Sequence, residues 1–173
     1  NIICSIAVLM LEGKNSKDIS SISKDIKLPT GRLERILKHD NFIYIDYAHT
    51  PEALEYALKE IKRSHEGDIC CVFGCGGDRD KQKRSLMGEV AERYSDHLIL
   101  TNDNPRNENE KDIIDDILSG IKQPKNVVVE LDRKIAIKKA IKYFEGDQKA
   151  VSYTHLRAHE TDSYLVCRLL LEK

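Results

Sequence analysis

The four residues Asp103, Asn104, Pro105 and Arg106 place an acid, an amide and a guanidinium in one short stretch. They follow the apolar run at 98–100 and lie within the segment TNDNPRNENE. An Asn-Pro pair is an ordinary way to form a turn, so a surface turn rich in turn-forming residues is the simplest interpretation. A turn between two regularly patterned segments does not require three such functional groups, and this excess makes the stretch a candidate binding site.

A glycine-rich segment, GCGGDRDKQKR at residues 74–84, directly follows another apolar run. Glycines let a backbone approach a ligand closely, and basic residues beside them favour contacts with an anion. The segment lacks the G-x-x-x-x-G-K-[ST] pattern of a P-loop, and it fails the dinucleotide pattern because Arg79 stands where a third glycine is needed. The alternative interpretation is a tight turn followed by a solvated run of charge.

A third polar stretch, IDYAHTPEALE, places Asp46 at the end of an expected strand, His49 in the following loop and Pro51 at the start of a helix. A carboxylate at a strand's end can accept hydrogen bonds from ribose hydroxyls, and a helix start offers unpaired N–H groups to an anion. A single histidine in such a loop has a structural role more often than a catalytic one, and both interpretations of His49 stay open.

The composition is that of a globular protein with one domain and a piece of another. The chain has 173 residues, of which 40% are hydrophobic and 33% charged. Its formal net charge of −1 gives no reason to expect a nucleic-acid partner. No apolar run reaches the ~18 residues that insertion across a membrane needs. The first residues, NIICSIAVLML, carry neither Met at the start nor a basic leader, so we expect a chain truncated upstream rather than a signal peptide.

The cysteines indicate neither a metal site nor a disulfide framework. No CxxC pair occurs among the five, and Cys70 and Cys71 are adjacent within an apolar segment. Small buried hydrophobes are the expected role of these two, and an intracellular, reducing compartment fits this cysteine usage best.

The apolar periodicity predicts alternating strands and helices. Helices are expected at 1–11, from Ser16 through Ile26, 51–63, 85–94, 111–121 and 133–144, and strands at 33–37, 42–46, 69–73, 98–100 and 127–130. Gly13 is placed to end the first helix and Ser16 to cap the second. The alternation predicts an α/β fold with a mainly parallel sheet, in which ligands bind beyond the carboxyl ends of the strands. Because the polar loops at 46–50, 74–84 and 101–106 all fall at that end, they should form one site.

After Ala150 the pattern stops where a further strand is due. The stretch VSYTHLRAHET resembles one translated frame of a transposon-end adaptor used in short-read sequencing libraries, and LVCRLLLEK resembles a frame of the outer adaptor. We therefore expect residues 151–173 to be read-through into adaptor rather than native protein, and we assign no metal site to the histidines in it. Another boundary is expected at 29–31, where Pro-Thr-Gly interrupts the pattern.

The stretches DYAHTP, GCGGDRDKxKR and DNPR, in this order and spacing, resemble the C-terminal domain of the Mur ligase family. The resemblance runs from Asn1 to about Ala150, and it implies a Rossmann-like, mainly parallel sheet with helices on both faces. Residues 1–30 would be the end of a central ATP-binding domain. Residues 31–150 would be an incomplete C-terminal domain whose last strands are missing, and residues 151–173 the non-native tail.

The resemblance also implies roles for individual residues. Those expected near the nucleotide are Asn1 at the adenine, Arg32 at the phosphates, Asp46 at the ribose and His49 in the same loop. Those expected to hold the incoming amino acid are Arg79, Asp103, Asn104, Pro105 and Arg106. No catalytic residue and no protein ligand of a metal is expected within this chain.

Within the family, DNPR marks members that add meso-diaminopimelate, whereas lysine-adding members carry a tetrapeptide without this arginine. Diaminopimelate is lysine with an additional carboxylate at its far end, which Arg106 can bind through two parallel N–H bonds. Asn104 can bond the same group, Asp103 can orient Arg106 or accept from an ammonium, and Pro105 stiffens the loop. Lysine would leave the guanidinium unpaired in a desolvated pocket. Sites built to bind a polar group of the substrate reject an analogue without that group by roughly 10⁴-fold.

The activity implied is ATP-dependent amide formation during bacterial peptidoglycan synthesis in the cytoplasm. ATP with Mg²⁺ phosphorylates a carboxylate of the UDP-N-acetylmuramoyl dipeptide, and the diaminopimelate amine attacks the resulting acyl phosphate. The family's P-loop, the modified lysine that holds magnesium and the Gly-Lys-Gly-His-Glu loop do not occur in this sequence. We therefore expect the chain by itself to be inactive and marginally stable.

Two other functions remain open from the sequence. One is a stand-alone nucleotide- or anion-binding module without catalysis. The other is a related ligase for a different amino acid, such as a polyglutamate-forming enzyme, although DNPR together with GCGGDRD argues against it. The missing third glycine argues against a redox dinucleotide enzyme.

Overall fold

The computed structural model describes residues 2–23, 31–38, 41–65, 67–124, 127–143 and 150–154. The chain divides between Thr30 and Gly31 into two compact units, and this division coincides with the boundary expected from the sequence. That the first unit belongs to a central ATP-binding domain remains a prediction. Within the described ranges, no helix is long and apolar enough to span a membrane.

The first unit contains two helices, α1 (Ile2–Leu11) and α2 (Ser16–Ser23). Gly13 follows α1 with φ +82°, the left-handed conformation in which glycine commonly ends a helix. The cap of α2 is Asn15, whose Oδ1 accepts a hydrogen bond from the Asp18 N–H at 2.9 Å. The expectation that Ser16 caps this helix was therefore wrong by one residue, because Ser16 already has a helical backbone.

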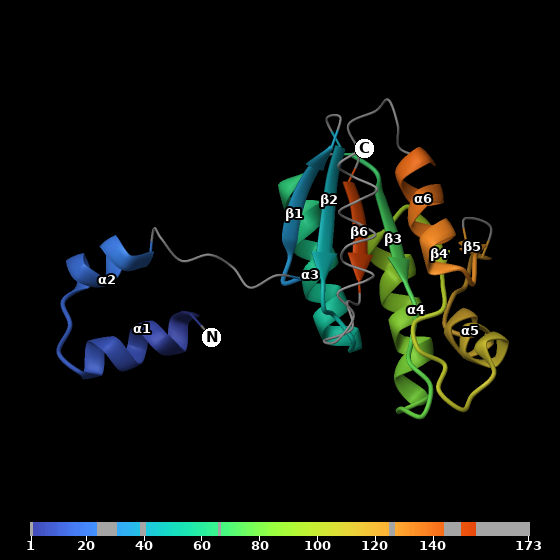
Figure 1. The fold of residues 1–173 in the computed structure, drawn as a ribbon, viewed down its shortest axis with the longest axis horizontal. Helices are drawn as coiled ribbons and strands as arrows, with labels where there is room; N and C mark the ends of the chain where they lie inside the picture. The colour runs from blue at the N-terminus through green and yellow to red at the C-terminus, as the bar shows by residue number, and fades with distance from the viewer. Residues whose placement is uncertain are drawn as a thin grey trace. The chain divides into compact units, whose positions relative to one another are not determined.

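The second unit is built on a six-stranded sheet with the order β1-β2-β6-β3-β4-β5 (Figure 1). The strands are β1 (Glu34–Lys38), β2 (Asn41–Asp46), β3 (Ile69–Phe73), β4 (His97–Leu100), β5 (Val127–Val129) and β6 (Ala150–Thr154). Only the β1–β2 pair is antiparallel among the strand pairs of the described residues. The expected α/β fold with a mainly parallel sheet is confirmed.

Strand β6 occupies a position that the sequence pattern left empty. It pairs in parallel with β2 on one side and with β3 on the other. The expectation that the pattern stops at Ala150 and that the last strands are missing was therefore wrong for this central strand. Residues 151–154, VSYT, include β-branched and aromatic residues, which favour strands. The hydrogen bonds between strands use backbone groups that every non-proline residue carries. The adaptor origin of residues 151–173 remains a prediction, and residues 155–173 lie outside the described part.

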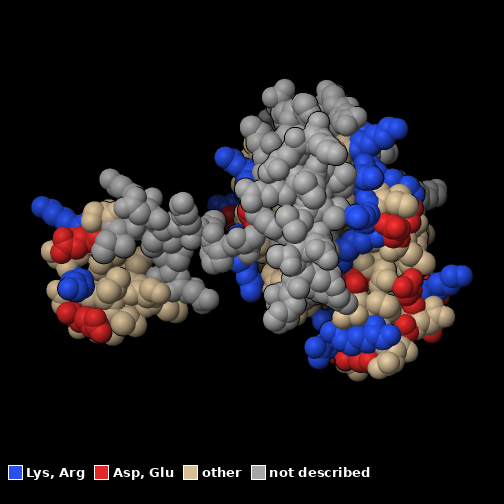
Figure 2. Space-filling view, viewed as in Figure 1, with Lys and Arg blue, Asp and Glu red and all other residues tan. Residues whose placement is uncertain are grey.

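Helices cover both faces of the sheet, as expected. α3 (Pro51–Ser64), α4 (Gln82–Tyr94) and α5 (Glu110–Leu118) share one apolar core with one face, and α6 (Arg133–Tyr143) forms a second core on the other face. Leu54, Leu58 and Ile61 are buried on α3, which confirms the inward face read from the sequence. Lys and Arg side chains gather along α6, with Asp and Glu side chains beside them (Figure 2).

The central strand β3 is buried along its whole length. Cys70 and Cys71 are 1% and 0% exposed, and burial raises the pKa of Cys70 to about 12. Burial likewise raises the pKa of Cys71 far above its ordinary value. The two thiols thus act as small core hydrophobes, as the sequence indicated.

Two glycines let α4 and α5 approach each other closely. A Cβ atom on Gly88 of α4 would lie 2.3 Å from the backbone oxygen of Ile117 in α5. A Cβ atom on Gly120, just after α5, would lie 1.8 Å from the backbone oxygen of Ser85. Any larger residue at either position would push the two helices apart. The side chains that these helices place at the carboxyl end of the sheet would move with them.

We expect Gly88→Ala to lower the free energy of unfolding by roughly 1–2 kcal/mol, the usual effect of overpacking. Helix propensity alone gives the opposite sign, because alanine is about 1 kcal/mol more favourable than glycine inside a helix. Urea unfolding of this variant decides between the two, with Gln82→Ala at the exposed start of α4 as a control. A stabilised Gly88→Ala protein would contradict the close approach.

Candidate functional site

Three loops that follow β2, β3 and β4 meet at the carboxyl end of the sheet. The backbone N–H of Gly77 donates to the Asn104 carbonyl at 2.7 Å, which joins the second loop to the third. Lys83 Nζ donates to the His49 carbonyl at 2.9 Å, which joins the start of α4 to the first loop. The structure therefore brings together the three polar stretches that the sequence placed in one site.

The glycine-rich loop lies directly against the DNPR loop, and glycine is required at the contact. A Cβ atom on Gly74 would lie 2.0 Å from the Thr101 carbonyl oxygen. A Cβ atom on Gly77 would lie 1.8 Å from the Pro105 carbonyl oxygen. These glycines serve the packing of one loop on the other, which differs from the close approach to a ligand that the sequence suggested for them.

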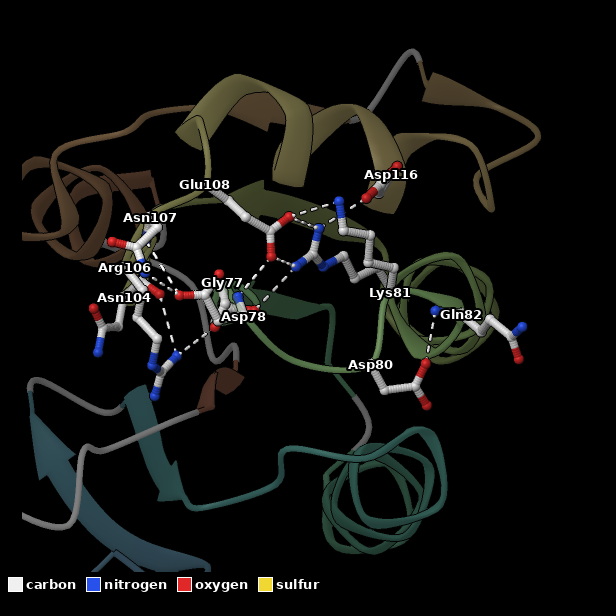
Figure 3. Close-up of polar contacts among 12 residues, drawn as sticks. Gly77, Asp78, Asp80, Lys81, Gln82, Asn104, Arg106, Asn107, Glu108 and Asp116 are labelled. Carbon is white, nitrogen blue, oxygen red and sulfur yellow. Dashed lines mark hydrogen bonds and ion pairs between the residues drawn. The ribbon is translucent and has the colours of Figure 1, made fainter.

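Arg106 is an exposed side chain that the protein holds by one nitrogen (Figure 3). Its Nη1 donates to the Gly77 carbonyl at 2.7 Å and reaches the Asn104 carbonyl at 3.5 Å. Within the described part of the chain, Nε and Nη2 make no hydrogen bond. These two nitrogens form one edge of the guanidinium, an edge that can bind a carboxylate through two parallel bonds. The geometry therefore suits the role that the sequence assigned to Arg106.

Asp103 is almost fully buried, with 3% of its side chain exposed, and forms an ion pair with Arg133 at 2.9 Å. Arg133 is the first residue of α6 and also donates to the Asn102 carbonyl at 3.3 Å. The sequence pattern gave no indication of Arg133, because its partner lies thirty residues earlier in a different loop. That Asp103 orients Arg106 or contacts a substrate ammonium stays a prediction.

The other expected amino-acid-binding residues are partly or fully exposed. The Asn104 carboxamide makes no hydrogen bond with the described residues, although its backbone carbonyl binds Gly77. The Pro105 carbonyl accepts from the Glu108 N–H at 2.9 Å, which closes a tight turn. Arg79 is exposed and forms no ion pair or hydrogen bond with the part of the chain that is described. Their contacts with an amino acid remain predictions.

Arg84 is the least expected residue of the site, because its side chain is fully buried. Nη2 and Nη1 donate to the two carboxylate oxygens of Glu108 at 2.8 and 3.0 Å, and Nη1 also donates to Asp116 at 2.8 Å. The sequence suggested either anion binding or a solvated charge run for this segment. Both interpretations were wrong for Arg84, which binds the protein's own carboxylates between α4, α5 and the loop before α5.

The Glu108 carboxylate binds several donors of the glycine-rich segment at residues 74–84 (Figure 3). Besides Arg84, it accepts from the Asp78 N–H at 2.6 Å and pairs with Lys81 at 3.0 Å. These contacts, led by the hydrogen bonds from Arg84, lower the pKa of Glu108 to about 2. Asp78 in turn accepts from the Asn107 side chain at 2.8 Å, so the two loops are joined by reciprocal bonds.

The expected nucleotide-side residues surround Tyr47. The Arg32 guanidinium lies over the Tyr47 ring at 4.9 Å, a cation–π contact, and His49 Nδ1 donates to the Tyr47 carbonyl at 3.1 Å. Asp46 accepts the Leu33 N–H at 2.7 Å, which fixes the entry to β1. Asn1 lies outside the described residues. The structure brings Arg32, Asp46 and His49 together, while their contacts with a nucleotide stay predictions.

The pKa of Glu108 gives a pH dependence with a definite sign. A carboxyl group whose pKa is lower in the folded than in the unfolded chain stabilises the fold above its unfolded pKa, and this stabilisation is lost as pH falls. Between about pH 4.5 and about pH 2, the free energy of unfolding should therefore fall more steeply for the unaltered protein than for Glu108→Gln. Urea unfolding at several pH values measures both slopes, and parallel curves would contradict the ion pair.

Known proteins share both the sequence and the arrangement of this domain. A family model described as "Mur ligase, glutamate ligase domain" matches residues 31–154. The chain is 45% identical over 153 residues to the UDP-N-acetylmuramoyl-L-alanyl-D-glutamate--2,6-diaminopimelate ligase of Aquifex aeolicus, covering 87% of this chain and 31% of that relative. It is 43% identical over 162 residues to the ligase of the same name from Buchnera aphidicola, covering 92% and 32%. The chain thus spans about a third of the length of these relatives.

Solved structures show the same fold. A structure titled as a UDP-N-acetylmuramoyl-L-alanyl-D-glutamate--2,6-diaminopimelate ligase has a TM-score of 0.72 and 29% identity, covering 98% of this chain and 37% of that one. A folylpolyglutamate and dihydrofolate synthase from Yersinia pestis, solved with AMPPNP and Mn, shares the fold with a TM-score of 0.66 at 18% identity, covering 91% and 35%. Because the family model matches well over half of the sequence, the chain belongs to the Mur ligase family, and residues 31–154 are its glutamate ligase domain.

Proposed function

We propose that this chain supplies the amino-acid-binding domain of an ATP-dependent ligase that adds meso-diaminopimelate to UDP-N-acetylmuramoyl-L-alanyl-D-glutamate in the bacterial cytoplasm. The observation that supports it most strongly is the state of Arg106, whose Nη1 is fixed to the Gly77 carbonyl at 2.7 Å while Nε and Nη2 make no hydrogen bond with a described residue. This arrangement occurs in a chain that is 45% identical to a ligase whose name states 2,6-diaminopimelate.

A fixed guanidinium suits a carboxylate better than an ammonium. The far end of meso-diaminopimelate carries both groups, whereas the far end of lysine carries only the ammonium. Charge attraction and two parallel N–H bonds favour the extra carboxylate, and a lysine side chain in the same place would meet like charge. The Asn104 carboxamide lies in the same turn and can bond the bound end of the substrate.

The domain's part in the reaction is to hold and present the amine. ATP with Mg²⁺ supplies the phosphoryl group that activates the carboxylate of the UDP-linked dipeptide. Arg32, Asp46 and His49 lie around Tyr47 at the carboxyl end of β2, where they can contact the phosphates and ribose of a nucleotide. The site loops then place the diaminopimelate amine for attack, so the contribution of this domain is positioning.

The direct test is amide formation by the full-length protein that carries this domain, with meso-diaminopimelate, lysine and glutamate compared under the same conditions. We expect a preference for diaminopimelate over lysine of roughly 10⁴-fold. A preference for glutamate would favour a polyglutamate-forming relative. Nucleotide binding without amide formation would favour a binding module, and the chain of 173 residues alone is expected to be inactive.

Arg106→Ala should lower kcat/KM for diaminopimelate by about 10- to 150-fold, the usual value of a hydrogen bond to a charged group. The residual rate with lysine should not fall, because lysine has no carboxylate at this position. Arg93→Ala is a matched control, since Arg93 is an exposed arginine near the end of α4 that pairs with Glu89 at 2.7 Å. Equal losses with both amino acids would contradict the role of Arg106.

Gly76→Ala tests the position of Arg106 while leaving its chemistry intact. A Cβ atom on Gly76 would lie 2.8 Å from Arg106 Nη1, a side-chain atom rather than backbone, so the guanidinium should be displaced from the Gly77 carbonyl at little cost in stability. We expect the KM for diaminopimelate to rise, with the melting temperature and the KM for ATP nearly unchanged. A variant with an unaltered KM would show that the fixed position of Arg106 is not needed.

A further inference from the structure

Arg84 contacts both of the loop segments that hold Arg106. Its Nη2 donates to the Gly76 carbonyl at 3.3 Å, one residue before the Gly77 carbonyl that receives Arg106. Its two hydrogen bonds to Glu108 hold the backbone two residues after Arg106. One buried side chain thus fixes the acceptor of Arg106 and the backbone that carries Arg106.

The same cluster holds two residues in an unfavourable backbone conformation. Asp78 has φ +52° and Arg106 has φ +50°, in the left-handed region that non-glycine residues rarely adopt. Glu108 accepts the Asp78 N–H, and Asp78 accepts the Asn107 side chain next to Arg106. Such strained residues persist only where the surroundings fix them, and they occur preferentially at binding sites.

A contribution to the stability of the fold does not by itself explain the buried ion cluster of Arg84, Glu108 and Asp116. Arg84 is fully buried, and its Nε has no hydrogen-bond partner among the described residues. A buried ion pair often contributes no more to stability than well-packed apolar residues would, whereas it does fix one arrangement of its partners. The arrangement that Arg84 fixes is that of the glycine-rich loop against the DNPR loop.

We propose that Arg84 is a positioning residue for amino-acid selection, which acts by aiming Arg106 at the distal carboxylate of the incoming diamino acid. This inference rests on the proposed function. Arg84 itself does not touch the substrate. It holds Gly76 and Glu108 so that Arg106 meets the carboxylate without further ordering of the loops.

The test compares Arg84→Gln and Arg84→Gln/Arg106→Ala with Arg106→Ala and the unaltered full-length protein. We expect Arg84→Gln to raise the KM for diaminopimelate by about tenfold to a hundredfold, the scale of a small misplacement at a reacting site. The KM for ATP and the residual rate with lysine should stay within about twofold. In the Arg106→Ala background, the effect of Arg84→Gln on diaminopimelate should disappear, because the residue through which it acts is gone.

If Arg84→Gln does not fold, Glu108→Gln can be tested in its place. Glu108→Gln retains the size of the side chain and an acceptor for the Asp78 N–H, and it should give the same selective rise in KM. Arg84→Lys should recover less than half of the loss, because an ammonium cannot reproduce the two-pronged contact with Glu108.

Three results separate the possible failures. Equal losses with diaminopimelate and lysine would show that Arg84 only supports the fold, and they would overturn the inference. A loss that persists in full without Arg106 would overturn it as well. An unaltered protein with no preference for diaminopimelate would instead overturn the proposed function on which the inference rests.

Discussion

The interaction on which the site depends is the fork between the buried Arg84 guanidinium and the Glu108 carboxylate. It joins the first turn of α4 to the loop before α5, two segments that come from different strand ends. Because Glu108 also receives the Asp78 N–H and Lys81, the glycine-rich loop closes around one carboxylate. The exposed Arg106 donates to the Gly77 carbonyl of that same loop, so the surface guanidinium and the buried charge pair contact one loop.

The glycines and the sheet make that charge pair possible. The parallel order of β3 and β4 places both loops at the same end, and Gly74 and Gly77 allow one loop to lie on the other with backbone contact. Gly88 brings α4 and α5 together so that Arg84 can reach Asp116. The ion pairs of the site therefore depend on the close packing that these glycines allow.

Periodicity and motif spacing were sufficient to predict the architecture and the meeting of the three polar loops. The mainly parallel sheet and the meeting of three polar loops could be predicted from strand-helix alternation, because the carboxyl ends of parallel strands lie at one edge of a sheet. The helices on both faces were implied by the resemblance to the Mur ligase family. The pairs Arg84–Glu108 and Arg133–Asp103 could not be identified from the sequence, because their members lie 24 and 30 residues apart and such a separation leaves no local pattern. Strand β6 was missed because the residues after Ala150 resemble adaptor sequence, although the alternation of strands and helices required a further strand there.

In the proposed function, a guanidinium fixed by the loop contacts binds the carboxylate that distinguishes diaminopimelate from lysine. A crystal structure of the full-length protein with meso-diaminopimelate bound tests it most directly. We expect two N–H···O bonds from Nε and Nη2 of Arg106 to the distal carboxylate, with Nη1 still on the Gly77 carbonyl and Arg84 still on Glu108. A substrate carboxylate bound elsewhere, with Arg106 turned into solvent, would contradict it.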